Sequence, residues 1–381
     1  MKRIVSFVLV IALVAVLLPV GVSAAGPEVA AKSAVLMDMT TGQVLYEHNA
    51  HEMLPPASVT KVMTLLLIME AIDSGRIGWD DTVTASESAA AKGGSQVYLK
   101  VGETMTVTDM VKSIAVSSAN DCACAMAEHI SGSEGAFVEA MNEKAKALGM
   151  EHTHFLNCTG LDDDPQASNH LTCAMDIAIM SRALMMEHPD IRKFTTIWMD
   201  TIRNGSFGLS NTNKLVRFYP GATGLKTGFT QKAGYCLSAT AQRDGMELVA
   251  TVMGSESSKD RFNACKQLLD YGFANYALVT PQTEEGQVPV KLGTADTVKV
   301  MPKEKIQLLV DKAQRNQVNI TTQLPDSIDA PVSKGQKIGT VTVRVGDQVV
   351  SEVPLLAQEA VPKLSWWQMF LRILRRICMA K

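Results

Sequence analysis

The pattern of apolar and polar positions changes once along this chain, near residue 280. Before that point, stretches with the period of about 3.6 residues that marks a helix are interleaved with strand-like runs. After it, helical periodicity fades and short strand-like runs follow one another. The pattern predicts helices over 58–72, 106–116, 120–130, 134–148, 174–186 and 261–274. The first of these is apolar on nearly every face after its first turn, which is typical of a helix inside a protein core.

Runs of β-forming residues separated by turn signals predict the strands. Residues 34–46 indicate one hairpin, and residues 235–253 indicate a second hairpin that turns at Asp244 and Gly245. Further strand-like runs cover 288–293, 297–301, 306–311, 317–323 and 338–356. We therefore expect a mixed α/β (α+β) body followed by a small all-β sandwich.

Residues 1–24 carry the three parts of a secretory signal peptide. Lys2 and Arg3 precede an apolar run over 4–18, and small residues follow at 22–24. An uncleaved membrane anchor is the alternative, but the run is shorter than the roughly 20 residues that a membrane span needs. We expect this segment to be cleaved at its end, and we therefore expect an exported protein.

Residues 361–381 predict an amphipathic helix. At about 100° per residue, three arginines fall on one narrow stripe, and apolar residues fill most of the remaining surface. Trp366 and Trp367 would then lie where aromatic rings gather at a membrane–water interface, while the arginines meet anionic lipid. We expect this helix to lie flat on a membrane surface; the alternative is a helix that packs on the protein's own body.

Composition narrows the class of protein. The chain has 381 residues, of which 46% are apolar and 20% charged, so it can form a large core and is not a mostly disordered chain. Its 36 basic and 39 acidic residues give a net charge of -3, which argues against a nucleic-acid partner. The predicted organisation is a signal peptide (1–24), an α/β domain (25–280), a β-sandwich domain (281–360) and an anchor helix (361–381).

Ser58 and Lys61 stand at the start of the predicted buried helix, directly after a pair of prolines. Side chains three residues apart lie on the same side of a helix. Burial brings the pKa of a lysine down from about 10.4 towards neutrality, and a neutral amine can activate a serine hydroxyl. Taken alone the spacing is common, and the simpler interpretation of Ser58 is a helix N-cap.

Two more short motifs follow at later points of the chain. Ser118-x-Asn120 lies between two predicted helices, where a hydroxyl and an amide could relay a proton and hold a substrate amide. Lys226-Thr227-Gly228 begins the strand-rich stretch, where a cation and a hydroxyl could bind a carboxylate and glycine lets a peptide approach the strand edge. Taken alone, the first motif is a helix cap and the second a turn before a strand.

The ordered set of motifs is far more specific than any one of them. Each of the three motifs occurs once: Ser-x-x-Lys, then Ser-x-Asn, then Lys-Thr-Gly. This order is typical of serine enzymes that react with β-lactams. The chain resembles the low-molecular-weight penicillin-binding proteins, the serine-type D-alanyl-D-alanine carboxypeptidases of peptidase family S11. Further segments that resemble this family are 55–64, 120–121, 154–161, 224–230 and 232–235.

The resemblance implies a serine β-lactamase/transpeptidase-like catalytic domain over 25–280. It implies that Ser58 is the acylated nucleophile, that Lys61 is its base and that Ser118 passes the proton onward. The backbone N–H groups of Ser58 and Phe229 would form the oxyanion hole; the family often has histidine at the position of Phe229. The implied substrate-binding residues are Asn120, Lys226, Thr227, Gly228, Phe229 and Arg261.

The activity that this resemblance implies is removal of the terminal D-alanine from peptidoglycan pentapeptide stems, through an acyl-enzyme on Ser58 and without a metal or organic cofactor. The implied partners are a stem peptide ending in D-Ala-D-Ala, β-lactam antibiotics as covalent inhibitors, and a membrane surface that the carboxyl-terminal helix contacts. The implied location is the outer face of the bacterial cytoplasmic membrane.

Two other functions share these motifs. A β-lactamase needs an added deacylating group, usually a glutamate followed by asparagine at the fourth position, whereas Glu187 is followed there by Ile191. A catalytically silent wall-binding protein would keep the fold but not the reaction. We rank both below the carboxypeptidase, because every hydroxyl and amine of the three motifs is present.

The histidines and cysteines indicate no second chemistry. None of the seven histidines lies in the three motifs, so a Ser-His-Asp triad is not indicated. His152-x-His154, near Asp162, Asp163 and Asp164, has the spacing of no common metal site and is more simply a solvated loop. Seven cysteines, an odd number in a chain this long, favour buried thiols over a disulfide framework.

Overall fold

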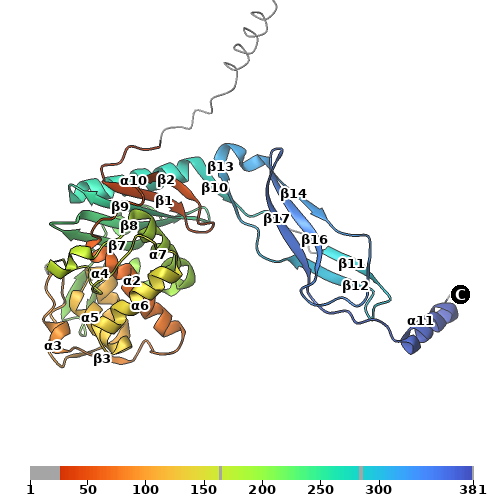
Figure 1. The fold of residues 1–381 in the computed structure, drawn as a ribbon, viewed down its shortest axis with the longest axis horizontal. Helices are drawn as coiled ribbons and strands as arrows, with labels where there is room; N and C mark the ends of the chain where they lie inside the picture. The colour runs from red at the N-terminus through yellow and green to blue at the C-terminus, as the bar shows by residue number, and fades with distance from the viewer. Residues whose placement is uncertain (1–25, 163–164, 283–285, 380–381) are drawn as a thin grey trace, which may run out of the picture.

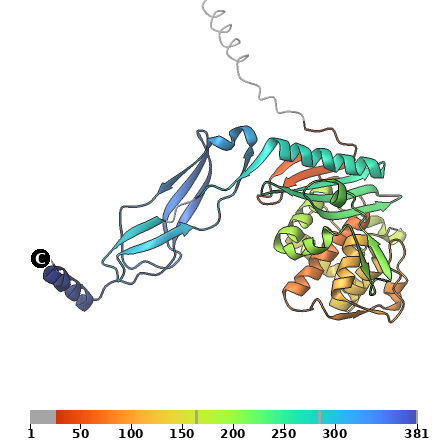
Figure 2. The ribbon, with the colours of Figure 1, turned by 180° about the vertical axis from the view of Figure 1, so that it is seen from behind.

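The structure is a computed structural model that describes residues 26–162, 165–282 and 286–379. The predicted signal peptide, residues 1–24, lies outside the described residues. Figure 1 shows an elongated molecule in which a mixed α/β body, a β domain and a short carboxyl-terminal helix follow one another, and Figure 2 shows the same order from behind.

A five-stranded antiparallel sheet forms the centre of the α/β body. Its strands are β1 Ser33–Asp38, β2 Val44–His48, β7 Ala222–Thr230, β8 Gly234–Arg243 and β9 Met246–Ser255. Their order is β2-β1-β9-β8-β7, so β9 lies in the middle and β7 at one edge. The two predicted hairpins are confirmed as β1–β2 and β8–β9. Every residue of β9 is buried, because helices cover both faces of the sheet (Figure 1).

The six predicted helices are confirmed, with differences at their ends. They are α2 Lys61–Asp73, α4 Val107–Ser117, α5 Asn120–Ser131, α6 Glu134–Ala147, α7 Ala174–Glu187 and α10 Ser258–Asn275. α10 packs on one face of the sheet, α7 packs on the other, and α2 packs against α7. α10 begins earlier than predicted because the Ser257 hydroxyl caps it, accepting from the backbone N–H of Asp260 at 3.1 Å.

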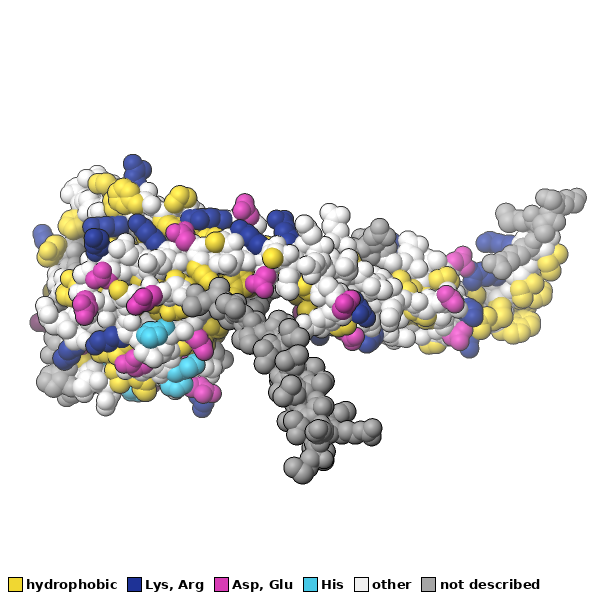
Figure 3. Space-filling view, turned by 90° about the horizontal axis from the view of Figure 1, so that it is seen from above, with side chains coloured by type: hydrophobic (Ala, Val, Ile, Leu, Met, Phe, Trp, Pro, Cys, Tyr) yellow, Lys and Arg dark blue, Asp and Glu magenta, His cyan; other side chains and the backbone are white. Residues whose placement is uncertain are grey.

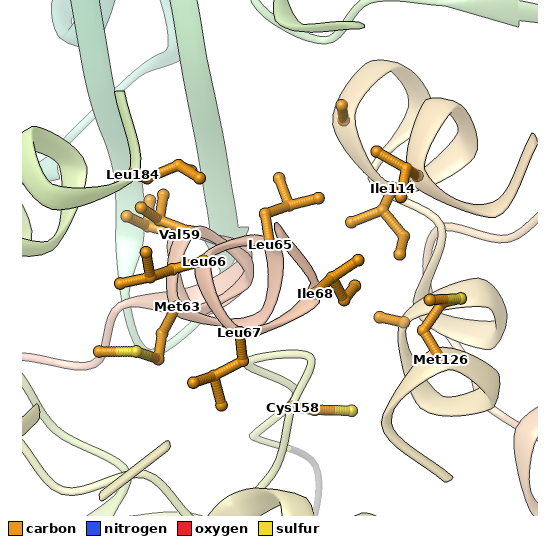
Figure 4. Packing of buried hydrophobic residues seen from close by; sticks show 14 of the residues in the cluster. Val59, Met63, Leu65, Leu66, Leu67, Ile68, Ile114, Met126, Cys158 and Leu184 are labelled. Atoms are coloured by element: carbon orange, nitrogen blue, oxygen red, sulfur yellow. The ribbon is translucent and has the colours of Figure 1, made fainter. Parts of the chain in front are cut away.

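The helix α2 is buried on nearly all sides. Figure 4 shows Ile68 of α2 directed toward Ile114 of α4 and Met126 of α5, with Leu184 of α7 on the opposite side. All four side chains are fully buried. Burying one such side chain contributes about 1.5–3 kcal/mol, so tertiary packing fixes the axis of α2 and, with it, the position of Lys61 at its first turn.

Short elements complete the α/β body. Two small ribbons pair β3 Thr82–Thr84 with β4 Thr104–Thr106, and β5 Met199–Ile202 with β6 Phe207–Ser210. The remaining helices are α3 Glu87–Ala90, α8 Arg192–Thr195 and α9 Leu215–Phe218, with 3-10 turns η1 Ala57–Thr60, η2 Pro165–Asn169 and η3 Pro189–Ile191. The β5–β6 ribbon was not predicted, because it is short and only partly buried.

The second domain is built from strands, as predicted. They are β10 Tyr276–Val279, β11 Gly286–Lys291, β12 Thr297–Pro302, β13 Leu308–Asp311, β14 Val318–Gln323, β15 Ile328–Asp329, β16 Lys337–Val345 and β17 Gln348–Ala357, with a 3-10 turn η4 Lys312–Gln317. Six strands form one sheet in the order β14-β16-β17-β12-β11-β15, while β10 and β13 pair separately. Alternate residues of β11 and β12 point inward, and their valines join a separate hydrophobic core. The expected fold class is therefore confirmed.

The last described element is α11, Trp366–Met379. Trp366 and Trp367 are 70% and 66% exposed, and Figure 3 shows hydrophobic side chains gathered along this end of the molecule. Arg372 ties the helix to the β domain, since its guanidinium donates to the Gly293 carbonyl at 3.0 Å and pairs with Asp296. Among the described residues, no helix is both long and apolar enough to cross a membrane.

Candidate active site

Ser58 and Lys61 meet at the junction of η1 and α2. Lys61 Nζ lies 2.8 Å from Ser58 Oγ. The reason is local: Ala57–Thr60 form a 3-10 turn, and a 3-10 helix has three residues per turn, so side chains at i and i+3 eclipse one another. The two residues that the sequence pairs are therefore held in hydrogen-bonding contact.

The amine of Lys61 is completely buried. Burial, the largest effect, lowers its pKa to about 7, although the negative charge of Asp121 works in the opposite direction. Nζ also lies 2.8 Å from the backbone carbonyl of Thr159, to which it donates. A neutral amine that donates to this carbonyl keeps its lone pair free for the hydroxyl of Ser58.

The Thr159 carbonyl is held by a tight loop that sequence reasoning missed. The side-chain oxygen of Asn157 accepts from the backbone N–H groups of Thr159 and Gly160 at 3.1 and 2.7 Å. Its amide nitrogen donates to the Leu161 carbonyl at 2.9 Å. A side chain on Gly160 would place its Cβ 1.8 Å from the carbonyl oxygen of Ala57. The turn signal Asn-x-x-Gly in segment 154–161 could have indicated this loop.

His170 contacts the 3-10 turn Ala57–Thr60, the nucleophile turn, which carries Ser58. The sequence did not indicate this histidine either. Its Nδ1 accepts from the backbone N–H of Leu156 at 3.0 Å, so the ring proton must lie on Nε2. Nε2 is 2.8 Å from Thr60 Oγ1, which in turn donates to the Ala57 carbonyl at 2.9 Å. Burial, with smaller contributions from His154 and Lys61, lowers the pKa of His170 to about 4, which keeps the ring neutral.

Ser118 and Asn120 lie in the turn between α4 and α5, as predicted. Ser118 ends α4 in a left-handed conformation (φ 64°) and is 3% exposed. The amide nitrogen of Asn120 donates to the Gly93 carbonyl at 2.7 Å. Its side-chain oxygen is buried and has no hydrogen-bond partner among the described residues. Gly94 gives this amide room, because a Cβ there would lie 2.8 Å from Asn120 Nδ2.

Lys226, Thr227 and Gly228 lie on β7, the edge strand of the large sheet. A Cβ on Gly228 would lie 2.7 Å from the carbonyl oxygen of Pro56 and 3.1 Å from the backbone nitrogen of Ser58. Glycine therefore allows this strand to pack directly against the nucleophile turn. The side of β7 that faces away from β8 pairs with no other strand among the described residues.

The Thr227 side chain connects this strand to the second motif. Thr227 Oγ1 donates to Thr212 Oγ1 at 2.7 Å, and the backbone N–H of Thr212 donates to the Val116 carbonyl at 3.1 Å. Val116 lies two residues before Ser118 in the same helix end. Thr212 thus links Thr227 of the third motif to the end of α4, directly before the second motif.

Two basic side chains, Lys226 and Arg261, lie at β7. Lys226 is buried, and its Nζ donates to the Thr227 carbonyl at 3.0 Å. Burial, followed by repulsion from Lys61 and Arg261, holds the pKa of Lys226 well below its usual range. Arg261, in the first turns of α10, donates to the carbonyl of Gly228 at 2.9 Å. An anion that binds here would relieve this repulsion.

Phe229 follows Gly228 and its side chain points outward. It is 45% exposed and stacks on Tyr235 of the neighbouring strand, with ring centroids 4.3 Å apart. The Arg261 guanidinium lies over the other aromatic ring, 5.3 Å from the Tyr235 centroid. The end of β7 therefore presents an aromatic surface instead of an ionisable ring.

Comparison with known protein families identifies the family of this chain. Residues 20–257 match the family described as D-alanyl-D-alanine carboxypeptidase, peptidase S11, and residues 273–363 match the penicillin-binding protein 5 carboxyl-terminal domain. The chain belongs to the D-alanyl-D-alanine carboxypeptidase family. The expected family and the expected class of enzyme are therefore confirmed.

Individual members of the family align over most of the chain. D-alanyl-D-alanine carboxypeptidase DacF of Bacillus subtilis is 43% identical over 340 residues, covering 87% of this chain and 86% of that protein. Penicillin-binding protein 5 from Haemophilus influenzae superposes with a TM-score of 0.77 and 30% identity, covering 90% of this chain and 100% of that one. Penicillin-binding protein D2 from Listeria monocytogenes, in its ampicillin-bound form, superposes at 0.59 with 31% identity, covering 65% of this chain and 100% of that one.

Proposed function

We propose that this carboxypeptidase removes the terminal D-alanine from peptidoglycan stem peptides ending in D-Ala-D-Ala, through an ester formed on Ser58. The observation that carries the proposal is the buried amine of Lys61, 2.8 Å from Ser58 Oγ, with a pKa lowered to about 7. At neutral pH a large fraction of this amine is uncharged and able to accept the hydroxyl proton.

The reaction has two steps with balanced proton transfers. Lys61 Nζ takes the hydroxyl proton while Ser58 Oγ bonds to the carbonyl carbon of the penultimate D-alanine. The peptide bond then breaks, and the proton that Lys61 took moves through the Ser118 hydroxyl to the leaving amine, so that free D-alanine departs and Lys61 is neutral again. Water hydrolyses the ester with Lys61 again as the base, which restores the Ser58 hydroxyl.

The substrate would bind as an added strand along β7. β7 is an edge strand, and among the described residues its outer side pairs with no other strand, so it can offer backbone hydrogen bonds to a peptide. The unpartnered side-chain oxygen of Asn120 is an acceptor that a substrate N–H would satisfy. Thr227 would bind the terminal carboxylate. Lys226 and Arg261 lie at the same strand, and the bound anion would stabilise their charged forms.

The tetrahedral intermediate needs donors for its oxygen. We assign these to the backbone N–H groups of Ser58 and Phe229. The assignment is supported by Gly228, the residue before Phe229, which packs directly against the backbone of Ser58. One such donor contributes on the order of 10²–10³ in rate. Only the backbone of Phe229 takes part, so the aromatic side chain at this position affects substrate preference and not the chemical step.

β-Lactams would acylate the same serine and leave it slowly. A β-lactamase would instead release the ester rapidly, and a silent wall-binding protein would not react at all. Purified protein should release D-alanine from a pentapeptide ending in D-Ala-D-Ala and retain one labelled penicillin per chain. The variant S58A should do neither, whereas S333A, which changes an exposed serine of the β domain, should do both.

Rapid turnover of nitrocefin by the wild-type protein would favour the β-lactamase instead. Failure of the wild-type protein both to release D-alanine and to bind penicillin would exclude the carboxypeptidase mechanism. If S58A retained full cellular function, the wall-binding alternative would gain support.

We also propose that the protein is exported and held at the outer face of the cytoplasmic membrane. Residues 1–24 would act as the signal peptide, residues 25–280 would catalyse, and residues 281–360 would separate the catalytic domain from α11. The exposed tryptophans of α11 support contact with a lipid surface. The reaction uses only side chains of the chain itself and needs no metal or organic cofactor.

A further inference from the structure

Three potential metal ligands meet on the α/β body outside the candidate active site. The side-chain ligand atoms of His51, His152 and Cys173 all lie within 4.8 Å of one another. His51 is exposed, His152 is half-buried and Cys173 is buried, so the cluster has one open side. The sequence could not bring these residues together, because each comes from a different segment of the chain.

Backbone hydrogen bonds hold the segments that carry the three ligands. Leu54 and Thr172 exchange two backbone hydrogen bonds, at 2.8 and 3.0 Å, which join the segment after His51 to the residue before Cys173. The backbone N–H of Met175 donates to the Ala50 carbonyl at 3.0 Å. The site therefore rests on ordered backbone and not on a free loop.

Asp176 fixes the segment of His152. Its carboxylate accepts from the backbone N–H of His152 at 2.9 Å and from the hydroxyl of Thr153 at 2.7 Å. His154 follows two residues after His152, but its backbone pairs with Leu171, and its side chain is not part of the cluster. The two histidines of His152-x-His154 therefore have different surroundings. His152 lies beside His51 and Cys173, a grouping that the sequence does not indicate.

Two imidazoles and one thiolate are the ligands that zinc and cobalt prefer, in tetrahedral geometry. Three protein ligands leave the fourth position for water. Cys173 caps α7, and its sulfur accepts from the backbone N–H of Asp176 at 3.4 Å. Burial raises the pKa of the free thiol to about 12, so a bound ion would have to displace the thiol proton. The rings of His51 and His152 have centroids 5.1 Å apart, and side-chain rotation would turn one nitrogen of each ring toward a shared ion.

We propose that His51, His152 and Cys173 form a binding site for one divalent transition-metal ion of the Zn²⁺ class. The site is separate from the hydrolytic reaction and does not depend on it. A bound ion would link the segment that leads into the nucleophile turn to the start of α7, since Leu54 lies four residues before Ser58. Metal binding should therefore raise the thermal stability of the protein.

The test is a Co²⁺ titration of the full chain without a polyhistidine tag. A C378S background is used because Cys378 is the only exposed cysteine among the described residues. We expect one equivalent of Co²⁺ to produce a sulfur-to-cobalt charge-transfer absorption in the near ultraviolet, which Zn²⁺ abolishes by displacement. The melting temperature should rise with Zn²⁺ in the same protein.

Matched variants identify the ligands. C173S should lose the absorption while keeping the cap of α7, because serine is a favoured N-cap, and its penicillin acylation should show that it is folded. H51A should weaken binding by about tenfold or more, without changing a buried residue. H129A, which changes an exposed histidine on α5, should bind Co²⁺ as the parent does.

Two outcomes would overturn the metal site. One is the absence of any cobalt–thiolate absorption at millimolar Co²⁺. The other is an absorption that C173S and H51A leave unchanged, which would assign the bound ion to other residues. Neither outcome bears on the hydrolytic function, because that function is measured by D-alanine release.

Discussion

A lysine amine enclosed by protein is the main chemical feature at the residue scale. Lys61 is fully buried and lies between a hydroxyl and a backbone carbonyl, each 2.8 Å away. Water cannot stabilise its charge there, so burial lowers its pKa to about 7. A buried lysine can thus serve as the base of a serine enzyme near neutral pH without a histidine or a metal.

The first prediction concerns the pH dependence of acylation. The second-order rate constant for labelled penicillin should fall about tenfold per pH unit well below pH 7, because the neutral fraction of Lys61 falls in that proportion. K61R should show almost no acylation at any pH in this range, since arginine keeps its proton. A rate constant that stayed flat from pH 8 to pH 5 would contradict this role for Lys61.

The second prediction concerns His170 and stability. Its pKa is lowered from 6.5 to about 4, so the unfolded chain binds more protons within this window. The free energy of unfolding should therefore fall as the pH drops from 6.5 towards 4, by at most about 1.4 kcal/mol per pH unit from this group. Urea unfolding at several pH values should show a smaller slope for H170Q, but not for H129Q. Equal slopes for H170Q and the wild type would exclude His170 as the source.

Sequence reasoning identified Ser58 and Lys61 because their relationship is local, three residues along one turn. Thr159 and His170 escaped it because they contact the same turn from 98 and 110 residues away in the chain. The Asn-x-x-Gly spacing could indicate the loop that contains Thr159, but neither it nor any periodicity indicates that this loop contacts the turn that carries Ser58. Their roles depend on how a loop folds back against η1, which only the packed structure contains.

At the element scale, the site forms where a helix start, a loop and an edge strand converge. η1 leads directly into the buried helix α2. In the 157–161 loop, the Thr159 carbonyl accepts a hydrogen bond from the Lys61 amine, and β7 packs against η1 at Gly228. The helices were predictable from strong apolar periodicity. β7 was recognised only as a motif, because its two glycines and one lysine interrupt the run of apolar residues that marks a buried strand.

The third prediction tests this convergence at Gly160. A Cβ there would collide with the Ala57 carbonyl, and the backbone has φ of 83°. G160A should lower the free energy of unfolding by about 2 kcal/mol or more and strongly slow acylation by penicillin. G149A is the matched control, since Gly149 has φ of 75° but nothing within 4 Å of its Cβ. Its loss should be about 1 kcal/mol, with acylation unchanged. Equal effects of the two substitutions would show that the Ala57 contact is unimportant.

At the scale of the whole molecule, the catalytic body and α11 lie at opposite ends of the elongated shape, with the β domain between them (Figures 1 and 2). The two domains have separate hydrophobic cores. The order of the parts was predictable from the change in periodicity along the chain. The contact between Arg372 and Asp296 was not, because it joins two separate predicted units.

The fourth prediction concerns the carboxyl-terminal helix. Removing residues 364–381 should abolish sedimentation of the protein with phosphatidylglycerol vesicles, because the exposed apolar face of α11 is lost. Penicillin acylation should stay the same, since the site lies in the other domain. R375E should weaken binding to anionic vesicles but not remove it, as Arg375 is one of several basic residues. Undiminished vesicle binding by the truncated chain would contradict a role for α11 in anchoring.

The most direct measurement is peptide mapping by mass spectrometry after penicillin treatment at neutral pH. The account predicts a single covalent adduct on Ser58, present in the wild type and absent from both S58A and a folded K61M. An adduct on Ser118 or another residue, or an unmodified protein, would contradict the assignment of Ser58 and Lys61 as nucleophile and base.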